Sequence, residues 1–298
     1  MATVMAFDRS HLDQLTALVN SHISSVVPGW GVSDEYLHTR LDRDPDEYVV
    51  DPWVAERETL VAIERERVVA AAHLKRYPDE ERVGHAYRGV AEIVWLVAWP
   101  DATDAGRALL GRVLQRFDEW AARERWGPQS LFVPSLSGVA DVWRHIGLLL
   151  REAGFTPGEP YAEAIWGGPL AGVPAAAEPP LDGLTIRRSV ANLSTRLEAM
   201  LDGHGVGVFD IASDLTEGGA LPSLRGWADV WTLEVVERHR NRGIGTWLVA
   251  HGVEWLRLAG CDRIVLPVAA ADEARGAGRF YERCGWRPLT RLERGWSL

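Results

Sequence analysis

The chain contains the same succession of predicted elements twice, and this repeat constrains its fold more than any other feature. In each half a strand-like apolar segment precedes a short turn rich in small residues, and apolar residues at helical spacing follow. The two strand-like segments are residues 92–99 and 228–236. Each half closes with glycine, an aromatic residue, any residue and proline, at 154–157 and 285–288. Duplication explains this order better than chance. Alternating strands and helices predict an α/β fold.

A proline-rich stretch at residues 167–183 separates the two halves. Its composition predicts a semi-rigid linker that holds neither a strand nor a helix. We therefore expect one domain at residues 1–166 and another at 184–298. The first copy has room for three strands and two helices before its turn, starting near Thr3. For the second copy and the later strands, the expected elements are a strand at 184–188, a helix around 192–201, and strands at 206–212, 130–133 and 263–268.

The charge balance limits the function classes. Lysine and arginine number 32 against 42 aspartates and glutamates, which gives a net charge of −10. A nucleic-acid binder needs a basic face, and so does a protein that sits on anionic lipid. The longest apolar run has seven residues, at 93–99, whereas a membrane span needs about 20. Two cysteines and scattered histidines predict neither a disulfide framework nor a metal site. We expect a cytoplasmic protein without metal, nucleic-acid or membrane partners.

The segment from Leu233 to Thr246 carries the strongest local signal. It reads as a strand, a short loop and a helix start. Gly243 and Gly245 allow a positive φ and a close approach of a ligand to the backbone. The first amides of the helix are unpaired, and nearby arginines add positive charge in an acidic protein. A pyrophosphate suits such a loop. The alternative is an ordinary glycine-rich helix start with solvated arginines.

This segment resembles motif A of the GNAT acyltransferases, which here reads Arg240-Asn241-Arg242-Gly243-Ile244-Gly245. Residues 277–286 resemble the last motif of the same family, with Phe280 and Tyr281 at its aromatic positions. The resemblance implies two tandem GNAT-like domains with mixed central sheets flanked by helices, and acetyl-CoA as the acyl donor. It also implies the donor-binding residues, which are Leu233, Val235, Arg240, Asn241, Arg242, Gly243, Ile244, Gly245, Thr246 and Phe280.

The resemblance implies catalytic roles as well. Tyr281 would protonate the leaving CoA thiolate, although an aromatic that only packs against the donor is the alternative. A carboxylate on the strand before the loop would accept the proton of the attacking amine. Asp229 and Glu234 are the candidates, and simple alternation places them on opposite faces of the strand. We prefer Asp229. Each acid has a plain alternative as a solvated or salt-bridged residue, and a water chain can replace a direct base.

The first copy has lost the residues that these roles need. Its motif A position reads as residues 103–108, with Thr103 in place of the arginine and Asp104 in the loop. Leu150 replaces the tyrosine, and Glu92 stands in the place of Asp229. We expect this copy not to bind CoA productively. Its expected role is to complete the acceptor pocket or to shield the shorter second copy.

We therefore expect an N-acyltransferase that moves an acetyl group from acetyl-CoA to a primary amine of a small molecule, by direct transfer in a ternary complex. A non-catalytic acyl-CoA-binding sensor or scaffold is one alternative. A protein or peptide N-acetyltransferase is another. The identity of the acceptor and the oligomeric state are left open, because fold-level analogy names no substrate.

Overall fold

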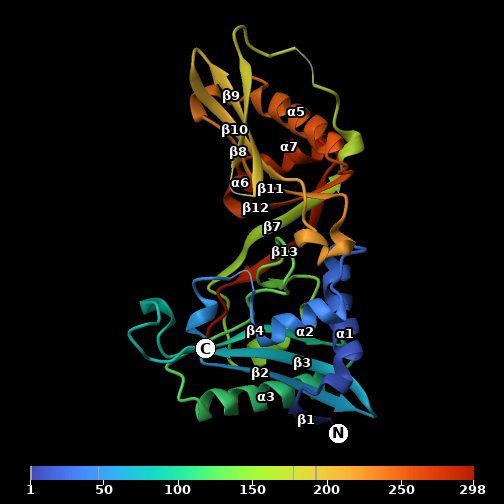
Figure 1. Ribbon diagram of the computed structural model, residues 1–298, viewed down its shortest axis with the longest axis vertical. Helices are drawn as coiled ribbons and strands as arrows, with labels where there is room; N and C mark the ends of the chain where they lie inside the picture. Colours follow the sequence, from blue (N-terminus) through green and yellow to red (C-terminus); the bar gives the residue numbers. More distant parts are fainter. Residues whose placement is uncertain (1, 46, 177, 192) are drawn as a thin grey trace. The chain divides into compact units, whose positions relative to one another are not determined.

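The computed structural model describes residues 2–45, 47–176, 178–191 and 193–298. The chain forms two compact units (Figure 1). Unit 1 comprises Met1–Ala162 and Thr290–Leu298, and unit 2 comprises Glu163–Leu289. Each unit has its own sheet with helices packed on it, so the predicted α/β class with two flanked sheets is confirmed.

Unit 1 has a five-stranded sheet of order β1-β2-β3-β4-β5, antiparallel except for the β4–β5 pair. Helix α3 covers one face, and α1 and α2 lie on the other (Figure 1). The expected two helices are present before the turn, together with four strands, which is one more than the three expected. The elements are β1 (Thr3–Ala6), α1 (Leu12–Val26), α2 (Asp34–Asp42), β2 (Glu56–Glu64), β3 (Arg67–Arg76), β4 (Val90–Ala98), α3 (Thr103–Glu119), β5 (Glu124–Trp126), β6 (Val139–Ala140) and α4 (Arg144–Glu152).

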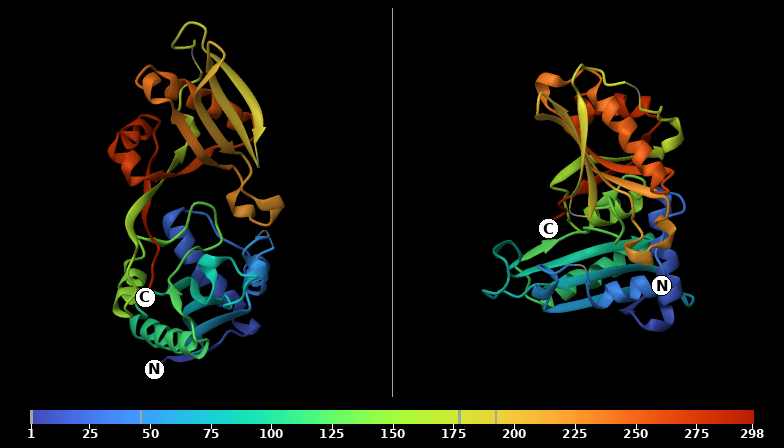
Figure 2. Two further views of the ribbon diagram at one scale, coloured as in Figure 1. Left: turned by 90° about the vertical axis from the view of Figure 1, so that its left-hand side faces the viewer. Right: turned by 45° about the horizontal axis from the view of Figure 1, so that its top comes forward.

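Unit 2 contains strands in the order β13-β7-β12-β11-β10-β9-β8. Helix α5 packs on β9, β10 and β11, on one face of this sheet (Figures 1 and 2). The elements are β7 (Glu159–Pro169), β8 (Thr185–Ala191), β9 (Ser194–Leu201), β10 (His204–Ala212), β11 (Trp227–Val235), α5 (Ile244–Leu258), β12 (Arg263–Ala269), α6 (Ala270–Ala274), α7 (Ala277–Arg283) and β13 (Arg287–Arg294). Short 3-10 helices occur at Arg9–His11, Asp51–Trp53, His85–Tyr87, Leu170–Gly172, Glu217–Gly219, Pro222–Leu224 and Glu237–His239.

The helix predicted around residues 192–201 is wrong, because residues 194–201 form strand β9. Asn192 itself lies outside the described residues. Leu197 and Ala199 are buried, and Arg196 and Glu198 beside them are not, which is the period of a half-buried strand. Strand β9 begins three positions after β8 ends, whereas α1 and α2 connect the corresponding strands of unit 1. The two residues between these strands in the second copy leave no room for a helical pair.

Two other local expectations are wrong. The first three residues of the predicted linker, 167–169, belong to β7, which pairs antiparallel with β12 from Glu163↔Ala269 to Pro169↔Arg263. The glycines serve close packing there, since a Cβ at Gly168 would lie 3.1 Å from the carbonyl oxygen of Gly285. The strand predicted at residues 130–133 is a loop with one bridge, Ser130↔Ser137, and the regular pairing falls earlier, in β5.

The closing strand of each unit comes from the other half of the sequence. In unit 2, β7 fills the place beside β12, although most of β7 lies within the first half of the sequence, residues 1–166. In unit 1, the residues after Thr290 fill the place beside β5, where Ser297 bridges Trp126 and Gly127 N–H donates to Trp296 C=O at 2.8 Å. Trp296 is fully buried in unit 1. Neither unit is complete without a strand from beyond the border between the two copies.

Candidate active site

Strand β11 separates from its parallel neighbour halfway along its length. It pairs with β12 through Trp227↔Arg263, Ala228↔Ile264 and Asp229↔Val265, and the pairing stops there although both strands continue. On its other edge β11 stays paired with β10 as far as Val235. The backbone edge of β11 after Asp229 is therefore open to an extended ligand, which can pair with it as an added strand does.

A β-bulge at Trp231 changes which residues of β11 share a face. The register with β10 shifts between Ile211↔Val230 and Asp210↔Thr232, so Trp231 is the extra residue. A bulge places two residues opposite one and shifts the alternation beyond it. Glu234 is paired with Val208, and Asp229 is paired with Ala212. Because Val208 and Ala212 are four positions apart on β10, both pairs lie on one face of the sheet. The expectation that Glu234 and Asp229 lie on opposite faces is therefore wrong.

The two carboxylates differ in burial. Asp229 is 8% exposed and lies at the last paired position of β11, next to the opening between the strands. Glu234 is exposed near the end of the strand. A third acid on the same face, Asp210, is already engaged: Ser194 donates to it at 2.7 Å and Arg196 at 2.6 Å. Sequence reasoning missed Asp210, because only the pairing of β10 with β9 reveals its partners.

The loop between β11 and α5 has a backbone shape suited to an anion. Asn241 and Gly243 both have a positive φ, of 59° and 84°, and α5 begins at Ile244. Such left-handed residues before a helix turn successive N–H groups to one side. The guanidinium of Arg240 donates to Val235 C=O at 2.9 Å and so ties the loop to the strand end. Arg242 is exposed in the loop and Thr246 is exposed in the first turn of α5.

The aromatic residues of α7 lie beside the start of α5. A Cβ on Gly245 would lie 3.7 Å from the ring of Phe280 and 3.7 Å from Val235, so the strand end, the helix start and α7 meet here. Leu233 is half-buried and packs against the same core. Pro180 also approaches this loop, with 3.0 Å between its Cβ and a Cβ built on Gly243. Its place in the predicted linker gave no signal of this contact.

Tyr281 is buried among aromatic rings. It stacks on Trp286 with 5.9 Å between ring centroids, and Trp166 of β7 lies 5.8 Å away at a tilt. Burial, with a smaller contribution from Cys284, raises the pKa of Tyr281 to about 12, so the phenol is protonated at neutral pH. Burial also raises the pKa of the Cys284 thiol to about 11. Cys284 is therefore a packed thiol and a poor nucleophile.

The first copy has the same strand arrangement, but a loop fills the opening between its parallel strands. Glu92 is the last residue of β4 that pairs with β5, as Asp229 is in β11, and Val94 is the bulged residue, as Trp231 is. Here, however, Val94 C=O accepts the N–H groups of Gln129 at 2.9 Å and Ser130 at 3.1 Å. The loop after β5 thus occupies the edge that β11 leaves open.

The first copy also lacks, before α3, the loop that precedes α5 in the second copy. Gly106 packs on Leu149 as Gly245 packs on Phe280, so Gly106 corresponds to Gly245. This equivalence places Asp104 where Gly243 stands, two residues from the alignment that the sequence suggested. Asp104 lies in the first turn of α3, which begins at Thr103, only a short segment after β4 ends. Where the second copy has a left-handed turn, the first copy has helix and a carboxylate.

Leu150 occupies the position of Tyr281. Phe155 N–H donates to Leu150 C=O at 3.0 Å, and Trp286 N–H donates to Tyr281 C=O at 3.1 Å, so the two helices end in the same hydrogen bond.

Neither copy offers a metal site: the described residues include no group of three or more His, Cys, Asp or Glu that could hold an ion. Among the described residues, every helix is too short or too polar to cross a membrane.

Unit 2 thus has a split parallel strand pair beside a left-handed loop and a helix start. Residues 197–286 match the model of the acetyltransferase (GNAT) family. Comparison with curated protein sequences finds no match. A tandem GNAT protein from the clavulanic acid biosynthesis pathway is 16% identical, with a TM-score of 0.60 over 100% of this chain and 98% of that chain. A GCN5-related N-acetyltransferase from Sphaerobacter thermophilus is 14% identical, with a TM-score of 0.58 over 99% and 94%.

Residues 197–286 therefore match the acetyltransferase (GNAT) family model, and the chain as a whole has the fold of the tandem GNAT proteins.

Proposed function

We propose that unit 2 transfers an acetyl group from acetyl-CoA to a primary amine of a small molecule, directly and within a ternary complex. The observation that carries the proposal is the coincidence of three features in unit 2. These are the open edge of β11 after Asp229, the left-handed loop at Asn241 and Gly243, and the phenol of Tyr281 on the neighbouring helix.

The residues of unit 2 fit the two polar parts of acetyl-CoA. The amides at the start of α5 and the exposed Arg242 suit a pyrophosphate, which a helix N-terminus and a backbone nest both favour. The backbone edge at Leu233 and Val235 is not paired with β12, although Arg240 donates to the Val235 C=O, and this edge suits the amide-rich pantetheine arm. Ile244, Gly245, Thr246 and Phe280 would border the donor at the helix start.

The chemistry requires two proton movements. The amine nitrogen forms a bond to the acetyl carbon and loses a proton, which Asp229 would accept directly or through water. The carbon–sulfur bond breaks, and the sulfur takes its proton or a hydrogen bond from Tyr281. Because burial raises the pKa of Tyr281 to about 12, well above the value of about 8.5 usual for a thiol, a strong hydrogen bond is its main contribution. Backbone N–H groups at the opening would stabilise charge on the carbonyl oxygen.

The charges near the opening favour a cationic acceptor. Asp229 and Glu234 share a face of β11, and the whole chain carries a net charge of −10. An amine arrives protonated at neutral pH, and negative potential concentrates such ligands.

The two cysteines are buried and form no disulfide bond, in keeping with a reducing compartment such as the cytoplasm.

Calorimetric titration of acetyl-CoA tests the donor site. We expect one molecule bound per chain and a loss of binding in Gly243→Asp. Gly243→Asn is the matched variant, because asparagine has the same shape and tolerates a positive φ without the charge. It should bind more tightly than the aspartate variant. Gly111→Asp, at an open position on α3, adds the same charge elsewhere and should bind as the wild type does.

An assay of free thiol release, combined with this titration, distinguishes the proposed small-molecule transferase from a protein N-acetyltransferase and from an acyl-CoA sensor. Free thiol release with a panel of small amines supports the proposal. Release only with peptides would favour a protein N-acetyltransferase. Donor binding with no release for any acceptor would favour an acyl-CoA sensor. If the wild type does not bind acetyl-CoA, or Gly243→Asp binds equally well, the donor site proposed here is wrong.

A further inference from the structure

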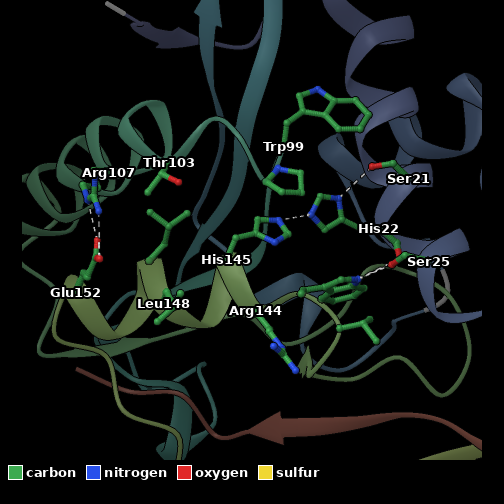
Figure 3. A pocket seen from close by; sticks show the side chains of 14 residues that line it. Ser21, His22, Ser25, Trp99, Thr103, Arg107, Arg144, His145, Leu148 and Glu152 are labelled. Atoms are coloured by element: carbon green, nitrogen blue, oxygen red, sulfur yellow. Dashed lines mark hydrogen bonds and ion pairs between the residues drawn. The ribbon is translucent and has the colours of Figure 1, made fainter.

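Unit 1 contains a cavity of about 660 Å³ that the proposed acetyl transfer does not use. Its walls come from α1, from the segment between β4 and α3, from the start of α3, and from α4 with the two residues before it (Figure 3). This volume falls in the range of roughly 300–1,000 Å³ that small-molecule sites occupy. The lining residues are Ser21, His22, Ser25, Trp99, Pro100, Thr103, Arg107, Val142, Trp143, Arg144, His145, Leu148, Leu149 and Glu152.

The cavity does not suit a phosphate-bearing ligand such as CoA. Asp104 stands in the first turn of α3, where the second copy has Gly243. The strand edge that would hold a pantetheine arm is taken, because Val94 C=O is bound by Gln129 and Ser130. A ligand of this cavity therefore has a different chemistry from the acyl donor.

Two neutral histidines supply a polar group in the cavity. His22 Nδ1 lies 2.9 Å from Leu18 C=O and His145 Nε2 lies 2.8 Å from Ala98 C=O, so both nitrogens must carry a hydrogen and donate. His22 Nε2 is then an acceptor, and it lies 3.3 Å from His145 Nε2 (Figure 3). Burial lowers the pKa of His22 to about 4 and lowers that of His145, which keeps both rings neutral.

This arrangement leaves one defined acceptor. With its Nε2 proton committed to Ala98 and His22, neutral His145 has a lone pair on Nδ1. Among the residues that the structure describes, nothing donates to that nitrogen. A ligand with a hydroxyl or an N–H group can fill this role.

One charge in the cavity is uncompensated. Arg107 and Glu152 form a two-bond ion pair, at 2.8 and 3.2 Å, at the opposite end from the histidines (Figure 3). Arg144 is exposed and has no ion-pair partner within the described ranges. The remaining walls are largely apolar and include Trp99, and Leu148 at the rim is 60% exposed.

We propose that this cavity binds a small organic anion with an aromatic body: its acid group pairs with Arg144, its rings contact Trp99 and Leu148, and a donor group reaches Nδ1 of His145. The site lies in the copy that has lost the acyl-donor residues. It is separate from the proposed transferase site and does not depend on it.

A pair of dyes tests the proposal on the full chain. The probe is 1-anilinonaphthalene-8-sulfonate, and N-phenyl-1-naphthylamine is its match, with the same rings and N–H but no acid. We expect saturable fluorescence with the sulfonate. Arg144→Ala should weaken the sulfonate roughly fivefold, since a solvent-exposed ion pair contributes about 1 kcal/mol or less, and leave the neutral dye unchanged. Leu148→Ala should weaken both dyes. Arg112→Ala removes an arginine of α3 that does not line the cavity, and it should change neither.

Competition with acetyl-CoA completes the experiment. Saturating acetyl-CoA should leave sulfonate binding in place, and Gly243→Asp should bind the dye as the wild type does. The proposal is overturned if Arg144→Ala and Leu148→Ala both bind the sulfonate normally. It is equally overturned if acetyl-CoA displaces the dye, because the dye then reports the donor site of unit 2.

Discussion

Glu92 and Asp229 occupy one position in two sheets: each is the last residue through which its strand pairs with the parallel strand that follows. Their surroundings differ. Glu92 is buried, faces Lys75 across the strands and accepts a hydrogen bond from Tyr77 at 2.9 Å. Asp229 borders an open strand edge. Duplication has therefore kept a carboxylate at this position in both copies, and only the second lies where a ligand can reach the neighbouring backbone.

This difference predicts opposite outcomes for two matched substitutions. Asp229→Asn should lower kcat/KM for the amine roughly 100-fold, because a positioned base contributes about that much. The deficit should shrink as the pH rises, since the amine then loses its proton in solution. Glu92→Gln should leave turnover within about twofold, given that its groove is filled. A wild-type pH profile in Asp229→Asn would assign the proton to a water chain instead.

Tyr281→Phe separates catalysis from packing. The ring remains and keeps its contacts with Trp286 and Trp166, so stability and the Kd for acetyl-CoA should hardly change. Loss of the hydroxyl should lower kcat roughly 100-fold if the phenol serves the leaving thiolate. Stopped-flow thiol release and calorimetry on the same preparation give both numbers. An unchanged kcat would reduce Tyr281 to a packing residue.

Stability should fall in acid because two histidines are buried in neutral form. Burial lowers the pKa of His22 to about 4 and that of His73 to about 3, with smaller contributions from His145 and from Lys75 and Arg57. The unfolded state takes up a proton near pH 6.5, which the folded state accepts only at lower pH. Each histidine therefore contributes stability above about pH 6.5 that is lost by about 1.4 kcal/mol per pH unit as the pH falls toward its folded pKa.

The measurement is urea unfolding of the full chain between pH 7 and pH 4. His73→Gln should flatten this dependence, and His85→Gln, an exposed control, should not. If His73→Gln keeps the full slope, carboxylates rather than this histidine cause the acid sensitivity.

Trp296→Ala should destabilise unit 1, to which this residue belongs. Its side chain is buried, Arg151 lies over its ring at 4.9 Å, and it packs so closely on Gly127 that a Cβ there would lie 2.5 Å away. Truncating a buried tryptophan costs about 3–5 kcal/mol. Leu258→Ala, at an 83% exposed position, should cost under about 0.5 kcal/mol. Hydrogen exchange should locate the loss in β4 and β5, and protection lost only in unit 2 would contradict the assignment.

Two helical glycines should respond oppositely to alanine. A Cβ on Gly252 of α5 would lie 2.2 Å from the ring of Phe209, so Gly252→Ala should cost about 1–3 kcal/mol through overpacking. Nothing lies within 4 Å of a Cβ on Gly111 of α3, so Gly111→Ala should stabilise by up to about 1 kcal/mol through helix propensity. Thermal unfolding of the two variants compares them directly. Similar shifts in both would show that the α5–β10 contact relaxes without cost.

The spacing of apolar residues and glycines along the sequence was sufficient to predict individual strands, helices and turns. Apolar runs placed β4, β11 and α5, and the glycines placed the loop at Asn241 and Gly243. The face of Glu234 was mispredicted because the bulge at Trp231 exists only in the pairing with β10. Residues 194–201 were mispredicted because their apolar residues fit the spacing of a helix as well as that of a strand. The roles of Trp166 and Trp296 depend on strands from the other half of the sequence, which no local pattern contains.

The closing strand of unit 1 comes from the C-terminal part of the sequence, and this has a consequence for folding during synthesis. Residues of unit 1 that pair with β5 and β6 follow the whole of unit 2 along the chain. As the ribosome makes the protein from its N-terminus, the first unit waits unfinished until the second has emerged. During that time the edge of β5 is unpaired, and unpaired strand edges are where nascent chains associate wrongly. A strand that is made after all of unit 2 thus completes unit 1.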